Sequence, residues 1–180
     1  ILWVGYPGQE GGNAVARVLF GDVSPAGRVP ITWPRSVLAL PPFEDYSMKG
    51  RTYKYMEEKH MLFPFGFGLS YAKFSYTGLR LAASTVTKGQ PLKMSVEVRN
   101  EGQVAADEVV QVYLRDEQAS VPVPQCKLAG FDRIHLSPGG SKRVEFTIPS
   151  AALAVIDEAG HEQWEEGAFT VFAGGCPPFA

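Results

Sequence analysis

The carboxylate best placed in this sequence to act as an acid or base is Glu10. It lies in a glycine-rich segment, residues 7–12, directly after an apolar run at residues 1–4. In open α/β sheets such strand ends line ligand crevices. The backbone amides of residues 7–12 could also hold an anion, but the Lys-Ser/Thr pair of a phosphate-binding loop is absent. Because most glutamates at such turns cap a helix or position a hydrogen bond, we do not expect Glu10 to transfer a proton directly.

Two other segments match catalytic or metal-binding motifs only in part. Ser70 lies between Gly68 and Ala72, one residue short of a nucleophile elbow, and the chain after it is expected to form a strand instead of the required helix. His161 and Glu162 begin like a zinc-binding helix, but the second histidine is missing. We therefore expect no catalytic residue, metal site or cofactor in this chain, and the substrate-binding residues stay unknown.

The composition excludes several classes of protein. Of the 180 residues, 45% are hydrophobic and 20% are charged, which favours a globular chain over a disordered one or a coiled coil. The formal net charge of −2 lacks the basic excess that nucleic acid requires. The apolar run at residues 151–156 is far shorter than the roughly 20 residues that span a bilayer, so no membrane segment is expected. Whether Cys126 and Cys176 pair is left open.

The first 33 residues predict a single β-α-β unit. The apolar run at residues 1–4 is typical of a strand buried on both faces. Residues 13–20 have helical spacing with Asn13 as a possible N-cap, and residues 28–33 indicate a short edge strand containing Pro30. Since such a sheet needs more strands and helical cover on both sides, we expect the remainder of this domain to lie upstream.

Residues 34–73 form an aromatic-rich linker without a sustained period. A solvated linker would not contain so many aromatic residues, so this segment is expected to pack across a neighbouring surface. Four of its aromatic residues could form a sugar-stacking rim, although packing in a core is the commoner fate of such rings. They are Tyr46, Tyr53, Tyr55 and Phe67.

Residues 74–180 predict an all-β domain, because the hydrophobic period changes to two. Leu92, Met94, Val96 and Val98 fall on one face of a strand, with polar residues between them. About seven short strands over roughly 100 residues, with turns every 8 to 12 residues, are typical of an immunoglobulin-like sandwich. The chain as a whole is therefore expected to be mainly β, with the β-α-β unit and the linker preceding the sandwich.

Several motifs in a fixed order resemble the C-terminal part of family 3 glycoside hydrolases, the β-glucosidase and β-xylosidase family. Residues 6–12, 19–22, 24–30, 50–55 and 63–71 read YPGQEGG, LFGD, SPAGRVP, GRTYKY and FPFGFGLSY. In the sandwich, residues 109–113, 128–131 and 136–139 read VVQVY, LAGF and LSPG, which are similar to the family's fibronectin type III-like domain. The resemblance covers essentially the whole chain and assigns residues 1–33 to the end of an α/β sandwich domain.

The resemblance implies that the chain is the C-terminal portion of a retaining, exo-acting β-glycosidase. Retention requires two carboxyl groups about 5 to 5.5 Å apart. In the family the nucleophilic aspartate lies on a barrel domain, and the acid/base glutamate usually lies in the α/β domain before the segment that here is residues 7–12. Glu10 is then not the acid/base, and the implied partners are the upstream barrel and α/β segment and an oligosaccharide or aryl β-glycoside substrate. An oligomer is possible, and the choice between a glucoside and a xyloside substrate stays open. The cellular location also stays open, although the resemblance to the family favours the periplasm or secretion over the cytoplasm.

Two structural hypotheses accompany this reading. Tyr53, Tyr55 and Phe67 are expected to clamp the sandwich onto the catalytic body by burying aromatic area. The alternative is an independent carbohydrate- or protein-binding module, whose site would be exposed aromatic residues on the sandwich such as Tyr113 or Trp164. A further alternative, hydrolysis of glycosides by this chain alone, is not expected.

Overall fold

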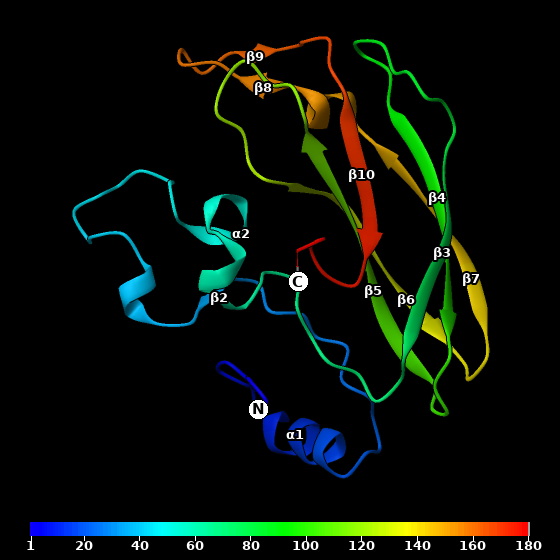
Figure 1. Cartoon of the computed structure of the whole chain (residues 1–180). Coiled ribbons are helices and arrows are strands. Elements are labelled where there is room, and N and C mark those ends of the chain that lie inside the picture. Colours follow the sequence, from blue (N-terminus) through cyan, green and yellow to red (C-terminus); the bar gives the residue numbers. More distant parts are fainter. Residues whose placement is uncertain (180) are drawn as a thin grey trace.

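The structure, a computed structural model that describes residues 1–179, is dominated by a β-sandwich (Figure 1). Its two antiparallel sheets have the strand orders β10-β5-β6 and β3-β4-β7. The strands are β3 (Phe74–Leu81), β4 (Leu92–Asn100), β5 (Ala106–Asp116), β6 (Lys127–Leu136), β7 (Ser141–Ile148) and β10 (Phe169–Gly174). The expected mainly-β sandwich is confirmed.

The hydrophobic core lies between these sheets because the strands alternate apolar and polar residues. On β4, Leu92, Met94, Val96 and Val98 are all buried, whereas Lys93 faces solvent. Both sheets contribute to the same cluster, and strands β5, β6 and β7 supply Val110, Val112, Leu114, Ile134, Leu136, Val144, Phe146 and Ile148. Burying each such side chain stabilises the fold by roughly 1.5–3 kcal/mol.

The turn that follows β4 is held by a buried amide. Asn100 Nδ2 donates to the carbonyl oxygens of Val104, 2.8 Å away, and Leu136, 3.0 Å away, and Asn100 Oδ1 accepts from the Gly102 N–H at 2.8 Å. All the polar capacity that a buried asparagine must satisfy is thereby used. The predicted turn at residues 100–102 is thus fixed to the neighbouring strand β6.

A short hairpin closes one end of the sandwich. The 3₁₀ helix η3 (Ser150–Leu153) leads into β8 (Val155–Ile156), which pairs with β9 (Glu162–Gln163). Asp157 Oδ1 accepts the backbone N–H groups of Ala159 and His161 and so forms the turn between the two strands. The strands expected near residues 155–157 and 168–173 are therefore confirmed as β8 and β10.

The N-terminal part differs from the expected β-α-β unit. Its helix forms as α1 (Gly11–Leu19), but Glu10 and not Asn13 occupies the N-cap position. Residues 1–4 form no strand and are exposed, because no other described segment offers them a hydrogen-bonding edge. The edge strand expected at residues 28–33 shrinks to β1 (Trp33–Pro34), which pairs with a strand of the linker.

The linker folds into short elements that lie beside the sheet β10-β5-β6 (Figure 1). They are η1 (Val37–Ala39), α2 (Thr52–Tyr55), η2 (Glu58–His60) and β2 (Met61–Phe63). Tyr53, Met56 and Met61 are buried together with Tyr113 and Cys126 of the sandwich in a second, smaller core cluster. The linker thus packs on the sandwich, as its aromatic content predicts. Within residues 1–179, no helix has the length and apolar character needed to cross a membrane.

Candidate functional site

The outer face of strand β5 is the most unusual surface of the sandwich, because it is buried although it points away from the core. Val110, Val112 and Leu114 face the other sheet, so the residues between them, Gln111 and Tyr113, face outward. Gln111 is nevertheless 3% exposed and Tyr113 is 0% exposed. The linker covers both, and we call this contact, formed by Tyr53, Phe65, Gly66, Gln111 and Tyr113, the linker seam.

Aromatic rings form one half of the linker seam. The ring of Tyr53 stacks on Phe65 with a centroid distance of 4.7 Å and meets the ring of Tyr113 edge-on at 6.0 Å. Both are favourable geometries for aromatic pairs. The Tyr53 hydroxyl accepts the backbone N–H of Leu128 on β6 at 3.1 Å. Burial raises the pKa of Tyr53, so the hydroxyl stays protonated.

A chain of hydrogen bonds forms the other half. The Tyr113 hydroxyl donates to Gln111 Oε1 at 2.6 Å, and burial raises the pKa of Tyr113, so this donor is retained. Gln111 Nε2 in turn donates to the carbonyl oxygens of Gly66, 3.1 Å away, and Gly175, 2.6 Å away. Gln111 therefore links the linker and the C-terminal segment to the centre of β5.

Gly66 is the one position of the linker seam where only glycine fits. Its φ angle is +79°, in the left-handed region. A Cβ atom there would also lie 2.9 Å from the Tyr113 hydroxyl and would overlap the Gln111 side chain. The FPFGFG motif thus brings its backbone close to the sandwich because this residue has no side chain.

A buried ion pair joins the N-terminal part to both sheets. Arg28 Nη2 lies 2.6 Å from Glu108 Oε2, and their side chains are 11% and 4% exposed. The other carboxylate oxygen accepts the Tyr76 hydroxyl at 2.6 Å. Burial, followed by the charge of Glu108, raises the pKa of Tyr76 and keeps that donor protonated. Among the described residues, Arg28 Nε and Nη1 have no hydrogen-bond partner, so Glu108 is the group that balances this cation.

Further hydrogen bonds tie helix α1 to the start of the sandwich. The Tyr71 hydroxyl donates to the carbonyl oxygen of Val18 at 2.7 Å. Ser24 Oγ lies 2.9 Å from Ser70 Oγ and accepts the Tyr71 N–H at 3.0 Å. Val29 exchanges backbone hydrogen bonds of 2.8 Å with residues 66 and 67. The position of α1 is therefore set by the segment that enters β3.

The residues singled out for chemistry in the sequence are not brought together. Ser70 serves as a hydrogen-bonding residue to Ser24 and the Ala72 N–H, with no histidine among its hydrogen-bond partners. Glu10 is exposed and accepts from Asn13 Nδ2 at 2.5 Å. His161 lies at the β8-β9 turn, 3.6 Å from Asp157. Within residues 1–179, no group of three or more histidine, cysteine or acidic side chains could hold a metal ion.

The two cysteines are free thiols. Cys126 is fully buried in the cluster that contains Tyr53 and Tyr113, and burial raises its pKa to about 11. Burial also raises the pKa of Cys176. Thiols held in this protonated state are poor nucleophiles, which fits structural roles for both residues.

The four linker aromatics take different positions. Tyr53 is buried in the linker seam, while Tyr55 and Phe67 are half-buried and Tyr46 is exposed. Phe67 stacks on Phe63 with a centroid distance of 5.2 Å. They therefore do not gather into one sugar-stacking rim.

The aromatic site suggested for a binding module is wrong. Tyr113 is fully buried, and Trp164 is half-buried and packs against the sandwich core. Both rings are used for packing, because the linker covers the outer face of β5 and the β8-β9 hairpin folds over the end of the core. Tyr113 therefore offers no exposed face to a sugar, and Trp164 exposes only part of its surface.

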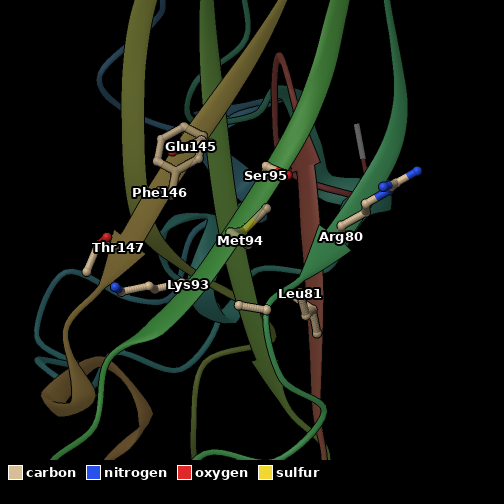
Figure 2. A pocket seen from close by; sticks show the side chains of 9 residues that line it. Arg80, Leu81, Lys93, Met94, Ser95, Glu145, Phe146 and Thr147 are labelled. Carbon is tan, nitrogen blue, oxygen red and sulfur yellow. The ribbon is translucent and has the colours of Figure 1, made fainter.

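A shallow hollow on the sheet β3-β4-β7 does not replace that site. Its lining comes from three neighbouring strands and includes Arg80, Lys93 and Glu145 (Figure 2). Figure 2 shows that Arg80 and Lys93 extend to opposite sides, so their charges do not converge on one ligand group. Phe146, the aromatic residue of the lining, belongs to the buried core.

Sequence reasoning missed the polar residues that join the sandwich to the rest of the chain: Gln111 in the linker seam, and the pair formed by Arg28 and Glu108. One sequence pattern did indicate that the outer face of β5 is covered. Residues 109–114 read VVQVYL, with large residues on both faces of the strand. Such a run indicates a strand covered on both sides. The pairing of Arg28 with Glu108, 80 positions apart, has no local signal at all.

Comparison with known proteins agrees with this architecture. Residues 1–71 match the glycosyl hydrolase family 3 C-terminal domain, and residues 108–175 match the fibronectin type III-like domain. Among solved structures, the chain superposes on a β-glucosidase from Erythrobacter marinus with a TM-score of 0.82 at 35% identity, covering 96% of this chain and 23% of the other. For a β-glucosidase from Chaetomella raphigera the TM-score is 0.86 at 28% identity, covering 98% of this chain and 28% of the other.

Curated relatives show the same relation. A putative beta-xylosidase from Formosa agariphila is 41% identical over 92% of this chain, and the match covers 22% of that protein. A periplasmic beta-glucosidase from Salmonella typhimurium is 39% identical over 97% of this chain, and the match covers 24% of that protein. The chain thus spans about a quarter of the length of the relatives it matches. It belongs to glycosyl hydrolase family 3, as the C-terminal portion of an enzyme of that family.

Proposed function

We propose that this chain forms part of a retaining, exo-acting β-glycosidase that hydrolyses terminal β-linked glucose or xylose. The observation that carries the proposal is the extent of the matches. Relatives named as β-glucosidases and β-xylosidases align over 92% and 97% of this chain, through both of its parts and in one order. The substrate would be an oligosaccharide or an aryl β-glycoside.

Within that enzyme the chain would supply support and no catalytic carboxylate. The carboxylate of Glu108 is buried, and both of its oxygens accept hydrogen bonds, one from Arg28 and one from Tyr76. A carboxylate held this way has no free oxygen to attack a sugar or protonate a leaving group. Glu10 is exposed at the start of α1 and bonded to Asn13.

Hydrolysis of nitrophenyl β-glucoside and β-xyloside tests the proposal. The complete enzyme that carries this chain should release nitrophenol from at least one of them with retention of configuration, and the 180-residue chain alone should release none. The Glu10→Gln variant of the complete enzyme should keep its kcat within a few-fold of the unsubstituted enzyme. Turnover by the chain alone, or inversion at the anomeric carbon, would contradict the proposal.

We also propose that Tyr53, Tyr55 and Phe67 act as a clamp between the sandwich and the catalytic body. The proposed division of the chain is residues 1–33 for the end of the α/β domain, 34–73 for the linker and 74–180 for the sandwich. The packing of Tyr53 on Phe65 and Tyr113 supports the sandwich side of the clamp. The half-buried state of Tyr55 and Phe67 leaves ring surface for the other side.

Alanine at each clamp position tests this idea through thermal stability of the complete enzyme. Tyr53→Ala should cost about 3–5 kcal/mol, because it removes a buried ring and leaves the Leu128 N–H without its acceptor. Tyr55→Ala and Phe67→Ala should lower the Tm by less. Phe131→Ala, at an aromatic residue that is exposed on β6, is the matched control. If none of the three clamp variants lowers the Tm, the clamp does not exist.

A further inference from the structure

Residues 37–48 present an unusual concentration of exposed apolar side chains. Six residues within this stretch are between 38% and 91% exposed. We call them the loop face: Val37, Leu38, Leu40, Phe43, Tyr46 and Met48. In Figure 1 this segment, in blue to cyan, projects from the sandwich on the side of α2. Isolated exposed apolar residues are ordinary, but six within twelve consecutive residues are a concentration typical of an interaction surface.

The backbone behind the loop face is held in one conformation. Arg51 Nε donates to the Ser47 carbonyl oxygen at 3.1 Å, and Arg51 Nη2 donates to the carbonyl oxygens of Pro42, at 3.2 Å, and Asp45. Asp45 Oδ1 accepts the Ser47 N–H at 2.8 Å, and this hydrogen bond lowers the pKa of Asp45. A loop fixed from behind by one guanidinium loses little conformational entropy when it binds, which favours affinity.

The base of the loop is tied to the part of the linker that packs on the sandwich. The Arg35 N–H donates to the His60 carbonyl oxygen at 2.9 Å, and Arg35 Nε donates to the Lys59 carbonyl oxygen at 3.1 Å. These bonds continue the β1-β2 pairing. The loop face is therefore connected to the sandwich through short, hydrogen-bonded elements.

The chemistry of the loop face indicates a protein partner. A sugar-binding platform consists of aromatic rings surrounded by hydrogen-bonding groups. Here Val37, Leu38 and Met48 add exposed aliphatic side chains to the two exposed rings of the same segment, Phe43 and Tyr46. Aliphatic side chains gain free energy on burial against other apolar groups, as in a protein interface.

We infer that the loop face docks on the portion of the same polypeptide that precedes this chain in the complete enzyme. This inference rests on the proposed function and names the surface by which the linker would meet the catalytic body. The match covers 24% of the Salmonella relative, which leaves 76% of that protein outside it. In the complete enzyme proposed above, most of the polypeptide would precede residue 1 and, being joined to it covalently, would be held at high effective concentration beside the loop face.

Photocrosslinking in the complete enzyme tests the inference. Phe43 is replaced by p-benzoylphenylalanine, and the same replacement at Phe131, which is 68% exposed on β6, is the matched control. Crosslinked peptides are identified by mass spectrometry in a mixture of ¹⁵N-labelled and unlabelled enzyme. We expect Phe43 to crosslink to residues that precede residue 1, in peptides of uniform label, with a yield several-fold above that of Phe131.

Each other outcome overturns the inference. Peptides of mixed label would assign the loop face to a second copy of the enzyme, and crosslinks confined to residues 1–180, or none, would leave it without the upstream partner. A second variant, Arg51→Met, removes the three side-chain hydrogen bonds to the loop backbone. It should reduce the crosslinking yield at Phe43 several-fold while leaving that at Phe131 unchanged.

The nitrophenyl glycoside assay on the unsubstituted enzyme separates this inference from the proposed function. An active enzyme without upstream crosslinks at Phe43 refutes the docking surface alone. An inactive enzyme with those crosslinks refutes the glycosidase proposal and leaves the docking surface in place.

Discussion

The sandwich and the N-terminal part of this chain treat their apolar residues in opposite ways. In the sandwich, the strands of both sheets bury a continuous set of aliphatic side chains between them. In the N-terminal part, helix α1 has no buried residue, and Leu19, Phe20 and the first four residues are all exposed. The comparison teaches that the sandwich completes its core from its own sequence, whereas the apolar residues of α1 find no cover among the described residues.

The difference in burial between α1 and the sandwich strands does not come from a less regular hydrophobic pattern in α1. Helix α1 places Val15, Val18 and Leu19 at helical spacing, as regularly as β4 alternates its apolar residues. The neighbours differ: β4 lies between β3 and β7, but α1 is held by the hydrogen bond from the Tyr71 hydroxyl to the Val18 carbonyl oxygen, and Ser24, which follows the helix, accepts the Tyr71 N–H. A hydrophobic pattern therefore predicts that a face will be covered, and it does not specify by which segment.

The largest expected effect concerns the ion pair that joins the two regions. Glu108→Ala should lower the free energy of unfolding of the chain by about 3–5 kcal/mol, because it leaves the Arg28 guanidinium buried without a counter-charge. Urea titration followed by tryptophan fluorescence measures this change. The matched control is Glu97→Ala, whose partner Arg143 lies 3.6 Å away and is about half exposed, so its cost should stay below about 1 kcal/mol. Equal costs for both variants would show that the N-terminal part is not coupled to the sandwich through Glu108.

Two leucines test the comparison most directly. Leu114 is 1% exposed in the sandwich core and Leu19 is 66% exposed on α1. In the 180-residue chain, Leu114→Ala should cost about 2–4 kcal/mol through the cavity it creates, and Leu19→Ala should stay within about 0.5 kcal/mol. In the complete enzyme, Leu19→Ala should instead lower the Tm, because α1 would then be covered. A Leu19→Ala chain as unstable as the Leu114→Ala chain would mean that α1 already packs within residues 1–180.

Most of the sandwich could be predicted from sequence because its stabilising contacts follow a short period. The alternation at Leu92–Asn100 and the turn at residues 137–140 indicate strand and turn without knowledge of any partner. Strand β6 was harder to predict, since only two of its ten residues are buried and its pairing with β5 shifts register between Val112 and Tyr113. Such irregularity weakens the period on which the prediction depends.

The linker seam and the first strand could not be predicted for a different physical reason. Gln111 and Gly66 meet across 45 positions, and Arg28 and Glu108 across 80, so no local pattern encodes either contact. The predicted strand at residues 1–4 requires a neighbouring edge, and the described residues supply none. That its apolar sequence needs cover stays a prediction, and we expect its secondary structure to depend on protein outside these residues.

The smallest expected effect is a pH dependence confined to the surface of the sandwich. Asp107 on β5 lies 2.6 Å from His135 Nδ1 and is also paired with Arg133, and the hydrogen bond with His135 is the main cause that lowers the pKa of Asp107. A carboxylate with a lowered folded-state pKa adds stability above its unfolded pKa of about 4, and this stability is lost as the pH falls through the folded value. Asp107→Asn should therefore reduce the free energy of unfolding by no more than about 1 kcal/mol at pH 7. In urea titrations the difference from the unsubstituted chain should shrink as the pH falls below about 4, because the carboxylate of Asp107 then begins to be protonated. A difference that does not shrink on acidification would mean that Asp107 stabilises the sandwich by packing and not by its charge.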